Sequence, residues 1–240
     1  MSRDVADILL IHGSCHGAWC WRDLIPALQA LGHAPRAIDL PGHGVDKTPV
    51  GEITLEAYDQ AVLAASTPET IVLGHSMGGY AITAAAERDP GAMAGLIYLC
   101  AYVPQSGVSL AQMRRQAPRQ PLLPAVRMAA DGRSFTVDPV LAPGIFYHDC
   151  PPDVVDYALA NLCPQPVAPT DAALHVTSRS TGLPRHYIRC TDDRTIPPEF
   201  QSTMTADWTN GTVQDIATGH SPFFSDPAGL AARIDAIARG

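Results

Sequence analysis

Residues 71–80 read IVLGHSMGGY and place one serine between two glycines where an apolar run ends. The pattern Gly74-x-Ser76-x-Gly78 matches G-x-S-x-G, which is a weak signal by itself. Its context is stronger, because "TIVLG" is typical of a buried strand and "MGGYAITAAAER" of a helix. A strand, a tight turn and a helix form the setting in which a serine hydroxyl stands clear of a sheet as a nucleophile. The alternative is that Ser76 only caps the helix.

Outward from this turn, the chain repeats the same rhythm of β-rich runs followed by helix-like segments. "ADILLIHG" precedes "WRDLIPALQALG", and "APRAIDL" precedes "TLEAYDQAVLAAS"; "AGLIYLCA", "RHYIRC" and "TVQDIA" follow later, before a final helix. Such alternation predicts a parallel sheet covered by helices on both faces. With "TIVLGH" there are six candidate strands. We therefore predict an α/β fold with a mostly parallel six-stranded sheet.

The region 104–184 breaks this rhythm and holds about half of the 22 prolines. The pieces "SLAQMRRQ" and "PDVVDYALANLC" have helical spacing and are separated by proline turns. We predict a small, mostly helical cap, inserted before the last two strands over the C-terminal edge of the sheet, where α/β folds bind ligands. Residues 1–103 and 185–240 would then form the core domain. The alternative is a long surface excursion.

Composition and charge narrow the possible functions. The 240 residues are 46% hydrophobic and 17% charged, which is typical of a globular domain. A formal net charge of -8 without a Lys/Arg cluster argues against nucleic-acid or anionic-membrane partners. The N-terminal residues lack the pattern of a signal peptide or membrane span, so we expect a cytoplasmic protein. The six cysteines form no CxxC pair and are expected to be reduced thiols.

A nucleophilic serine needs a base, usually a histidine held by a carboxylate. Of nine histidines, His220 is the one that lies between the last strand and the last helix, where a base of this kind is expected. Asp192 and Asp193 both lie on the loop after an earlier strand, and either could instead cap the following turn. Structural roles are expected for the other histidines considered: His12, His16, His43, His75, His148, His175 and His186.

An attacked carbonyl also needs donors for its developing negative charge. The turn places the N–H of Met77 at a helix start, and "LLIHGSCHGAW" offers a second N–H at Ser14, with Gly13 allowing close approach of the backbone. "FYHDC" at 146–150 is not expected to bind metal, because adjacent side chains of an extended segment point apart.

Four stretches, "IHGSCHGAWCW", "GHSMGGY", "YIRCTDDRTIPPEFQ" and the late "GH", resemble the α/β-hydrolases grouped with plant methylesterases and hydroxynitrile lyases. The resemblance implies an α/β-hydrolase fold with Ser76 as nucleophile and His220 as base. It also implies Asp193 as the acid, because the family's acid lies seven residues before the phenylalanine that is Phe200 here. Ser14 and Met77 correspond to the oxyanion amide donors.

The lyases of this family carry a threonine and a lysine at two positions that are Gly13 and Ser221 here, so the resemblance favours the esterase branch. We therefore expect acyl transfer on a small carboxylic ester, with no cofactor and no metal, by a monomer or homodimer. Phe146 and Tyr147 suggest a hydrophobic or aromatic substrate portion and, with Gly13 and Ser221, are the candidate pocket residues. The alternatives are lyase, lactone or carbon–carbon bond cleavage on the same triad, or a low-turnover small-molecule receptor.

Overall fold

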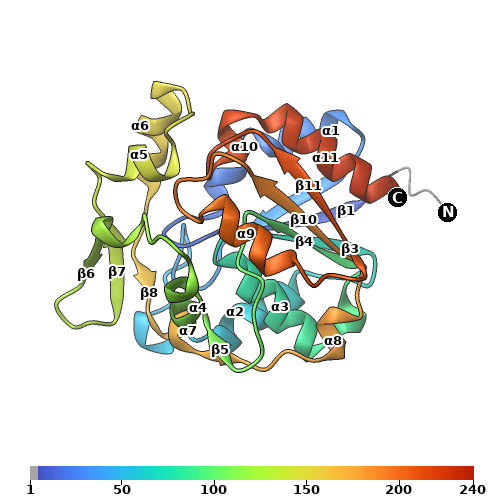
Figure 1. Cartoon of the computed structure of the whole chain (residues 1–240), viewed down its shortest axis with the longest axis horizontal. Helices are drawn as coiled ribbons and strands as arrows, with labels where there is room; N and C mark the ends of the chain where they lie inside the picture. Colours follow the sequence, from blue (N-terminus) through green and yellow to red (C-terminus); the bar gives the residue numbers. More distant parts are fainter. Residues whose placement is uncertain (1–4) are drawn as a thin grey trace.

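A six-stranded sheet crosses the middle of the computed structural model, which describes residues 5–240 (Figure 1). The first four positions of the expected core segment lie outside the described residues. All neighbouring strands are parallel, in the order β11-β10-β4-β3-β1-β2. The prediction of an α/β fold is confirmed, since each of the six predicted runs forms one strand. The strands are β1 (Asp7–Ile11), β2 (Ala34–Ile38), β3 (Thr70–His75), β4 (Gly95–Leu99), β10 (Arg185–Cys190) and β11 (Gly211–Ile216).

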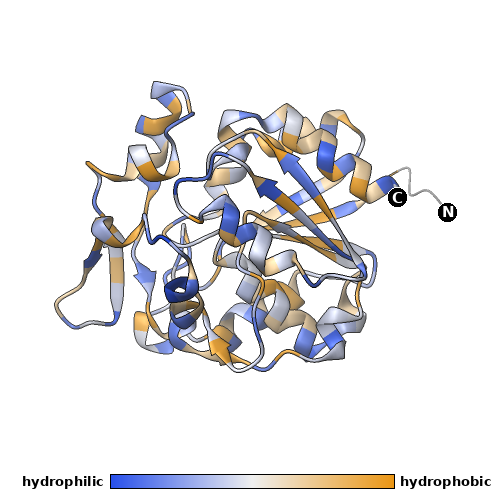
Figure 2. Cartoon of the chain, viewed as in Figure 1, coloured by the Kyte–Doolittle hydropathy of each residue, from blue (hydrophilic) through white to orange (hydrophobic). Residues whose placement is uncertain are grey.

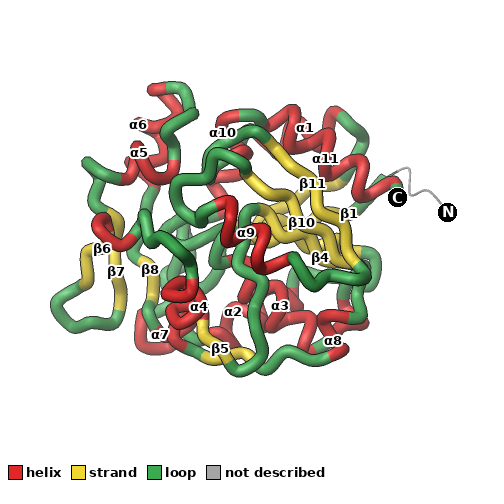
Figure 3. Tube along the Cα trace, viewed as in Figure 1, coloured by secondary structure: helices red, strands yellow, loops and turns green. Residues whose placement is uncertain are grey.

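Helices cover both faces of the sheet (Figure 3). Strand β1 shows why, because Ile8 and Leu10 belong to one buried cluster while Leu9 and Ile11 belong to the other. Successive side chains of a strand point to opposite faces, so an uninterrupted apolar run needs a cover on each side. The helices of the first cluster are α1 (Leu24–Ala30), α10 (Pro222–Ser225) and α11 (Pro227–Arg239); those of the second are α2 (Leu55–Ala64), α3 (Gly78–Arg88) and α9 (Pro198–Thr205). Short 3₁₀ turns are η1 (Ala18–Trp21), η2 (Val50–Glu52) and η3 (Pro90–Ala92).

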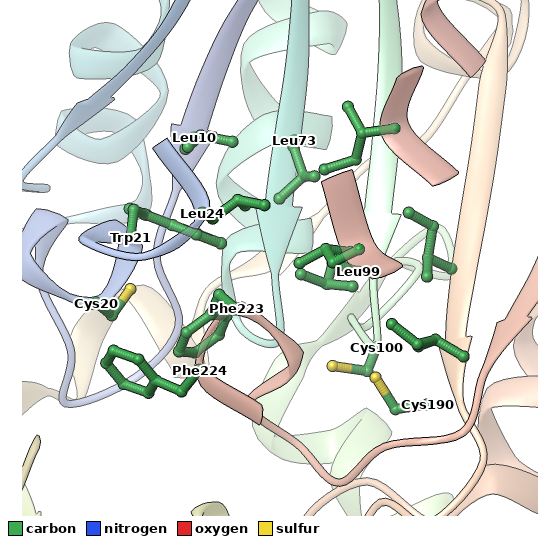
Figure 4. Close-up of a cluster of buried hydrophobic side chains, with 14 of the residues drawn as sticks. Leu10, Cys20, Trp21, Leu24, Leu73, Leu99, Cys100, Cys190, Phe223 and Phe224 are labelled. Carbon is green, nitrogen blue, oxygen red and sulfur yellow. The ribbon is translucent and has the colours of Figure 1, made fainter. Parts of the chain in front are cut away.

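Aromatic side chains anchor α10, which directly follows the loop that carries His220 (Figure 4). The ring centroid of Phe223 lies 5.0 Å from that of Trp21 and 4.9 Å from that of Phe224. All three side chains are buried, and burial of each contributes roughly 1.5–3 kcal/mol. The core therefore fixes the chain immediately after His220.

The region between β4 and β10 contains short elements; in Figure 1 it occupies the left side and runs along the bottom to α8 at the lower right. The two predicted helices are present as α4 (Leu110–Gln116), which is strongly hydrophilic in Figure 2, and α6 (Pro152–Asn161). The region also carries antiparallel strands that the sequence did not predict, in a three-stranded sheet β6-β7-β8 and a pair β5-β9. Its other elements are β5 (Val108–Ser109), η4 (Leu123–Ala125), β6 (Val126–Met128), β7 (Ser134–Val137), α5 (Ala142–Phe146), β8 (Gln165–Pro166), α7 (Ala168–Asp171), β9 (Ala173–Leu174) and α8 (Ser178–Thr181).

Two further features concern the chain as a whole. None of the helices within residues 5–240 has the length and apolar character that crossing a membrane requires. All six cysteines are free thiols, and four of them are buried.

Candidate active site

Ser76 lies in a strained turn between β3 and α3. Its φ of 54° falls in the left-handed region, which a residue with a Cβ adopts at an energetic cost. Helix α3 begins two residues later, and no side chain caps it. The Ser76 hydroxyl makes no hydrogen bond to any described residue, so the helix-cap alternative is not realised. A Cβ built on Gly74 would lie 2.7 Å from the carbonyl oxygen of Gly78, which shows how closely strand and helix pass.

The loops after β10 and β11 bring Asp193 and His220 together. Nδ1 of His220 lies 2.8 Å from Oδ2 of Asp193, and both side chains are buried. The carboxylate accepts three further hydrogen bonds, from the N–H of Thr195 at 2.6 Å, the N–H of Ile196 at 3.0 Å and Nε2 of Gln201 at 2.9 Å. A carboxylate surrounded by four donors has one defined orientation, so it holds the imidazole in place.

His75 forms a hydrogen bond with the backbone carbonyl of His220. Its Nε2 donates to that carbonyl over 2.9 Å, because a carbonyl oxygen can only accept. Nδ1 then carries the lone pair, and it is buried without a partner among the described residues. Burial holds the pKa of His75 well below its usual range, so the ring is neutral. The sequence predicted only a structural role for this side chain and did not indicate its contact with His220.

The two expected oxyanion donors meet because β1 and β3 are neighbours, with Ile11 opposite Gly74. Ser14 follows β1, Met77 follows β3, and both line the same pocket as Ser76. Neither backbone N–H donates to an acceptor within residues 5–240. Two unused N–H groups beside a serine are what a developing oxyanion requires.

The space beside Ser76 amounts to about 530 Å³, a volume that includes the part open to solvent. One wall comes from the core and the other from the region 104–184. The lining residues are Ser14, His16, His75, Ser76, Met77, Tyr102, Leu110, Ala111, Arg114, Leu122, Phe135, Phe146, Thr170, Thr195 and His220. Most of this surface is apolar, and Arg114, which sequence reasoning did not single out, is the one arginine or lysine among these lining residues.

Of the four candidate pocket residues, Phe146 lines the pocket and stacks on the ring of His220, with centroids 5.8 Å apart. The other three do not line it. Tyr147 is buried and turned toward the first loop, Ser221 is fully buried, and Gly13 packs so closely that an added Cβ would lie 2.9 Å from Cβ of Ser76.

His16 orients the loop that carries Ser14. Its Nδ1 donates to the carbonyl of Ser14 over 2.8 Å, and its Nε2 accepts the hydroxyl of Tyr147 over 2.7 Å. Both ring nitrogens are used by a neutral imidazole, and burial lowers the pKa of His16 to about 4. The ring therefore fixes the peptide next to one expected oxyanion donor.

Residues 145–149, which we name the bridging segment, contact three loops of the site: those that follow β1, β10 and β11. The carbonyl of Ile145 accepts the hydroxyl of Thr195 at 3.0 Å, on the loop of Asp193. Tyr147 reaches His16, as described above. Oδ2 of Asp149 accepts the N–H of Gly219 at 2.6 Å, next to His220.

The fourth contact of the bridging segment involves Asp192. Nε2 of His148 lies 2.9 Å from Oδ2 of Asp192, and this hydrogen bond lowers the pKa of the carboxyl group. The side chain of Asp192 is 64% exposed, whereas that of Asp193 is completely buried. The structure therefore brings Asp193, and not Asp192, to His220.

The other histidines considered from the sequence have local hydrogen-bond partners. His12 bonds the carbonyl of Gly13 and the N–H of Leu40; His43 bonds Gln165; His175 bonds Ser106; and His186 bonds Thr212.

One group of possible metal ligands is also present, since atoms of His75, Cys100 and His220 lie within 4.8 Å of one another. Burial raises the pKa of the Cys100 thiol well above its ordinary value, so the group lacks the thiolate that a metal would need, and we assign no metal to it.

Known proteins resemble this chain along nearly its whole length. The model of the alpha/beta hydrolase family matches residues 8–233. Methylesterase 17 of Arabidopsis thaliana is 29% identical over 245 residues, covering 94% of this chain and 89% of the relative. A pyrethroid hydrolase of Sphingobium wenxiniae is 30% identical over 244 residues, which cover 96% of this chain and 86% of the relative. The crystal structure of a pyrethroid hydrolase from Sphingobium faniae superposes with a TM-score of 0.86 at 29% identity, covering 98% and 97%. The chain therefore belongs to the alpha/beta hydrolase family, in the group of plant methylesterases and related ester hydrolases.

Proposed function

We propose that this protein is a carboxylic ester hydrolase in which Ser76, His220 and Asp193 form a catalytic triad. The observation that carries the proposal is the buried pair of His220 and Asp193, 2.8 Å apart, in which His220 lines one pocket with the strained Ser76. The relatives named methylesterase and pyrethroid hydrolase support ester hydrolysis as the reaction.

The hydrogen bond of Nδ1 to Asp193 leaves Nε2 of His220 as the basic nitrogen. In the first half of the reaction, Nε2 takes the proton of the Ser76 hydroxyl as its oxygen attacks the ester carbonyl. The carbonyl oxygen becomes an oxyanion, which the N–H groups of Ser14 and Met77 stabilise. His220 then protonates the leaving alcohol, and the acyl group remains on Ser76.

In the second half, His220 takes a proton from water as the water oxygen attacks the acyl carbonyl, and then gives that proton to Oγ of Ser76 as the acyl–Oγ bond breaks and the carboxylic acid leaves. Asp193 keeps His220 in the productive tautomer and stabilises the imidazolium in both halves. These steps use only side chains and amides of this chain.

We further propose that residues 104–184 act as the cap of the core formed by 1–103 and 185–240. This region supplies much of the pocket wall, including Leu110, Leu122, Phe135 and Phe146. An apolar wall favours a small ester with a hydrophobic portion.

The test is turnover of methyl and aryl esters by Ser76→Ala, with Ser66→Ala as a matched control at the end of α2, where the hydroxyl bonds the carbonyl of Val62. We expect Ser76→Ala to lose at least about a thousandfold in kcat and to resist labelling by a serine-directed phosphonate, while the control keeps both properties. Retention of more than a few percent of activity by Ser76→Ala would exclude this mechanism. Labelling without turnover would favour the receptor alternative, and cleavage of cyanohydrins the lyase.

A further inference from the structure

Arg114 projects a positive charge to a pocket that is otherwise mostly apolar. It lies on α4, and Leu110 and Ala111 of the same helix line the pocket with it. Within the described lining, Arg114 is the only lysine or arginine. Its Nε is buried and has no hydrogen-bond partner among residues 5–240.

Seven of the other described arginines pair with acids. Arg88 binds Asp59 and Glu56, and three more surface pairs are Arg119 with Glu199, Arg127 with Asp138 and Arg189 with Asp215. No described carboxylate forms such a pair with Arg114. A partly desolvated guanidinium without a partner is unfavourable, so an anionic group that reaches it would be bound well.

Tyr102 adds a second donor at the same place. It lines the pocket, and its hydroxyl makes no hydrogen bond to the described residues. Burial raises the pKa of Tyr102, while the nearby charge of Arg114 opposes that rise. The phenol of Tyr102 therefore stays protonated at neutral pH. Its O–H and the N–H groups of Arg114 are all hydrogen-bond donors, so a ligand bound between them must supply acceptors.

We propose that Arg114 and Tyr102 bind a carboxylate carried by the substrate, so that the preferred substrates are half-esters of dicarboxylic acids. The inference rests on the proposed function, since the ester carbonyl is placed at Ser76. A guanidinium matches a carboxylate in a planar, two-bonded geometry. One cation in the lining suits a monoanion better than a phosphate dianion. The apolar residues between the two ends would contact the hydrocarbon chain that joins them.

The experiment compares monomethyl esters of glutaric, adipic and pimelic acid with neutral analogues in which the free carboxyl is a primary amide. Methanol release gives kcat and KM for each. We expect the acid to exceed its amide in kcat/KM by about tenfold to a hundredfold at the best chain length, mostly through KM, because a charge-assisted contact is lost in the amide. A phosphate-bearing methyl ester is the third arm and should gain less.

The variants are Arg114→Gln and Arg114→Met, with Arg115→Gln as the control. Arg115 is the next residue of the same helix, is exposed and does not line the pocket, so the control removes the same charge from the same element. We expect both Arg114 variants to bring the acid-to-amide ratio close to one and Arg115→Gln to keep it. Arg114→Lys should retain part of the preference, because it keeps the charge and loses the planar fork.

An acid-to-amide ratio near one in the wild type, or an unchanged ratio in the Arg114 variants, would overturn the inference while neutral ester hydrolysis still supports the proposed function. If no ester is cleaved, calorimetric titration of the wild-type protein with monomethyl adipate and its amide still shows whether the pocket prefers a carboxylate. Equal affinity for the two ligands would refute the carboxylate site.

Discussion

Replacing Asp193 by asparagine tests both the acid–base pair and its surroundings. The carboxylate accepts four hydrogen bonds, two on each oxygen: Oδ1 from the N–H groups of Thr195 and Ile196, and Oδ2 from Gln201 and His220. An amide has only one acceptor oxygen, so its NH₂ group must face two donors in either orientation. With the NH₂ group turned toward Gln201 and His220, the ring can accept from it by changing tautomer, so at least one buried donor, the Nε2 group of Gln201, loses its acceptor.

A buried donor left without a partner costs about 1–3 kcal/mol, so Asp193→Asn should lose roughly 1–3 kcal/mol of stability. For a chain of this length that lowers Tm by about 2–12 °C. Loss of the carboxylate also permits the tautomer with hydrogen on Nε2 of His220, which cannot accept the serine proton. For this reason kcat should fall by about ten-thousandfold.

The matched control is Asp192→Asn, one residue earlier, where the side chain is 64% exposed and bonds His148 instead of His220. We expect its kcat within about threefold of wild type, because exposed pairs contribute little. Thermal unfolding and turnover of an aryl ester at pH 7 measure both effects. A folded Asp193→Asn protein with more than a tenth of wild-type kcat, or a larger loss in Asp192→Asn, would refute the assignment of roles.

Three further changes have defined outcomes. Gly74→Ala should destabilise the protein by about 1–3 kcal/mol in denaturant unfolding because its Cβ meets the backbone of the facing helix, whereas Gly144→Ala, with open space around it, should be nearly neutral; equal effects would contradict the tight turn. The folded-state pKa of His16 is about 4 against an ordinary 6.5, so the unfolded chain binds more protons between these pH values and this residue removes about 2 kcal/mol of stability from pH 7 to pH 5. His16→Gln should show a shallower loss over that range, and an identical slope would exclude the contribution. Asp149→Ala removes the acceptor of the Gly219 N–H and should lower kcat by about threefold to tenfold with little change in KM; an effect on KM alone would argue against its support of the histidine loop.

The parallel sheet was predictable because its central strands are apolar runs, as in Ile8 to Ile11, where both faces are buried. The short strands of the region 104–184 were not. β8 consists of Gln165 and Pro166. Two residues are too few to show the alternation of apolar and polar side chains from which a strand is predicted. Its pairing with β7 depends on tertiary contacts of distant segments, which local patterns do not encode.

The same limit applies within the site. Ser76 and His220 occur in recognisable turns, but local sequence could not choose between Asp192 and Asp193. The two carboxylates differ in their partners, His148 for Asp192 and His220 for Asp193, which lie 44 and 27 residues away in the chain. The contact of His75 with the carbonyl of His220 spans 145 residues. Arg114 sits in a helix with ordinary amphipathic spacing, and only the pocket distinguishes it from the exposed Arg115.

The bridging segment has a consequence for how molecules enter and leave. Lifting residues 145–149 from the core would break four hydrogen bonds together and release all three loops of the site. If ligands entered and left by that path, the loops that carry Ser14, Asp193 and His220 would lose these four hydrogen bonds in every catalytic cycle. A route for the ligand that leaves residues 145–149 in place keeps these four hydrogen bonds. The catalytic loops can then hold their positions while a ligand enters or leaves.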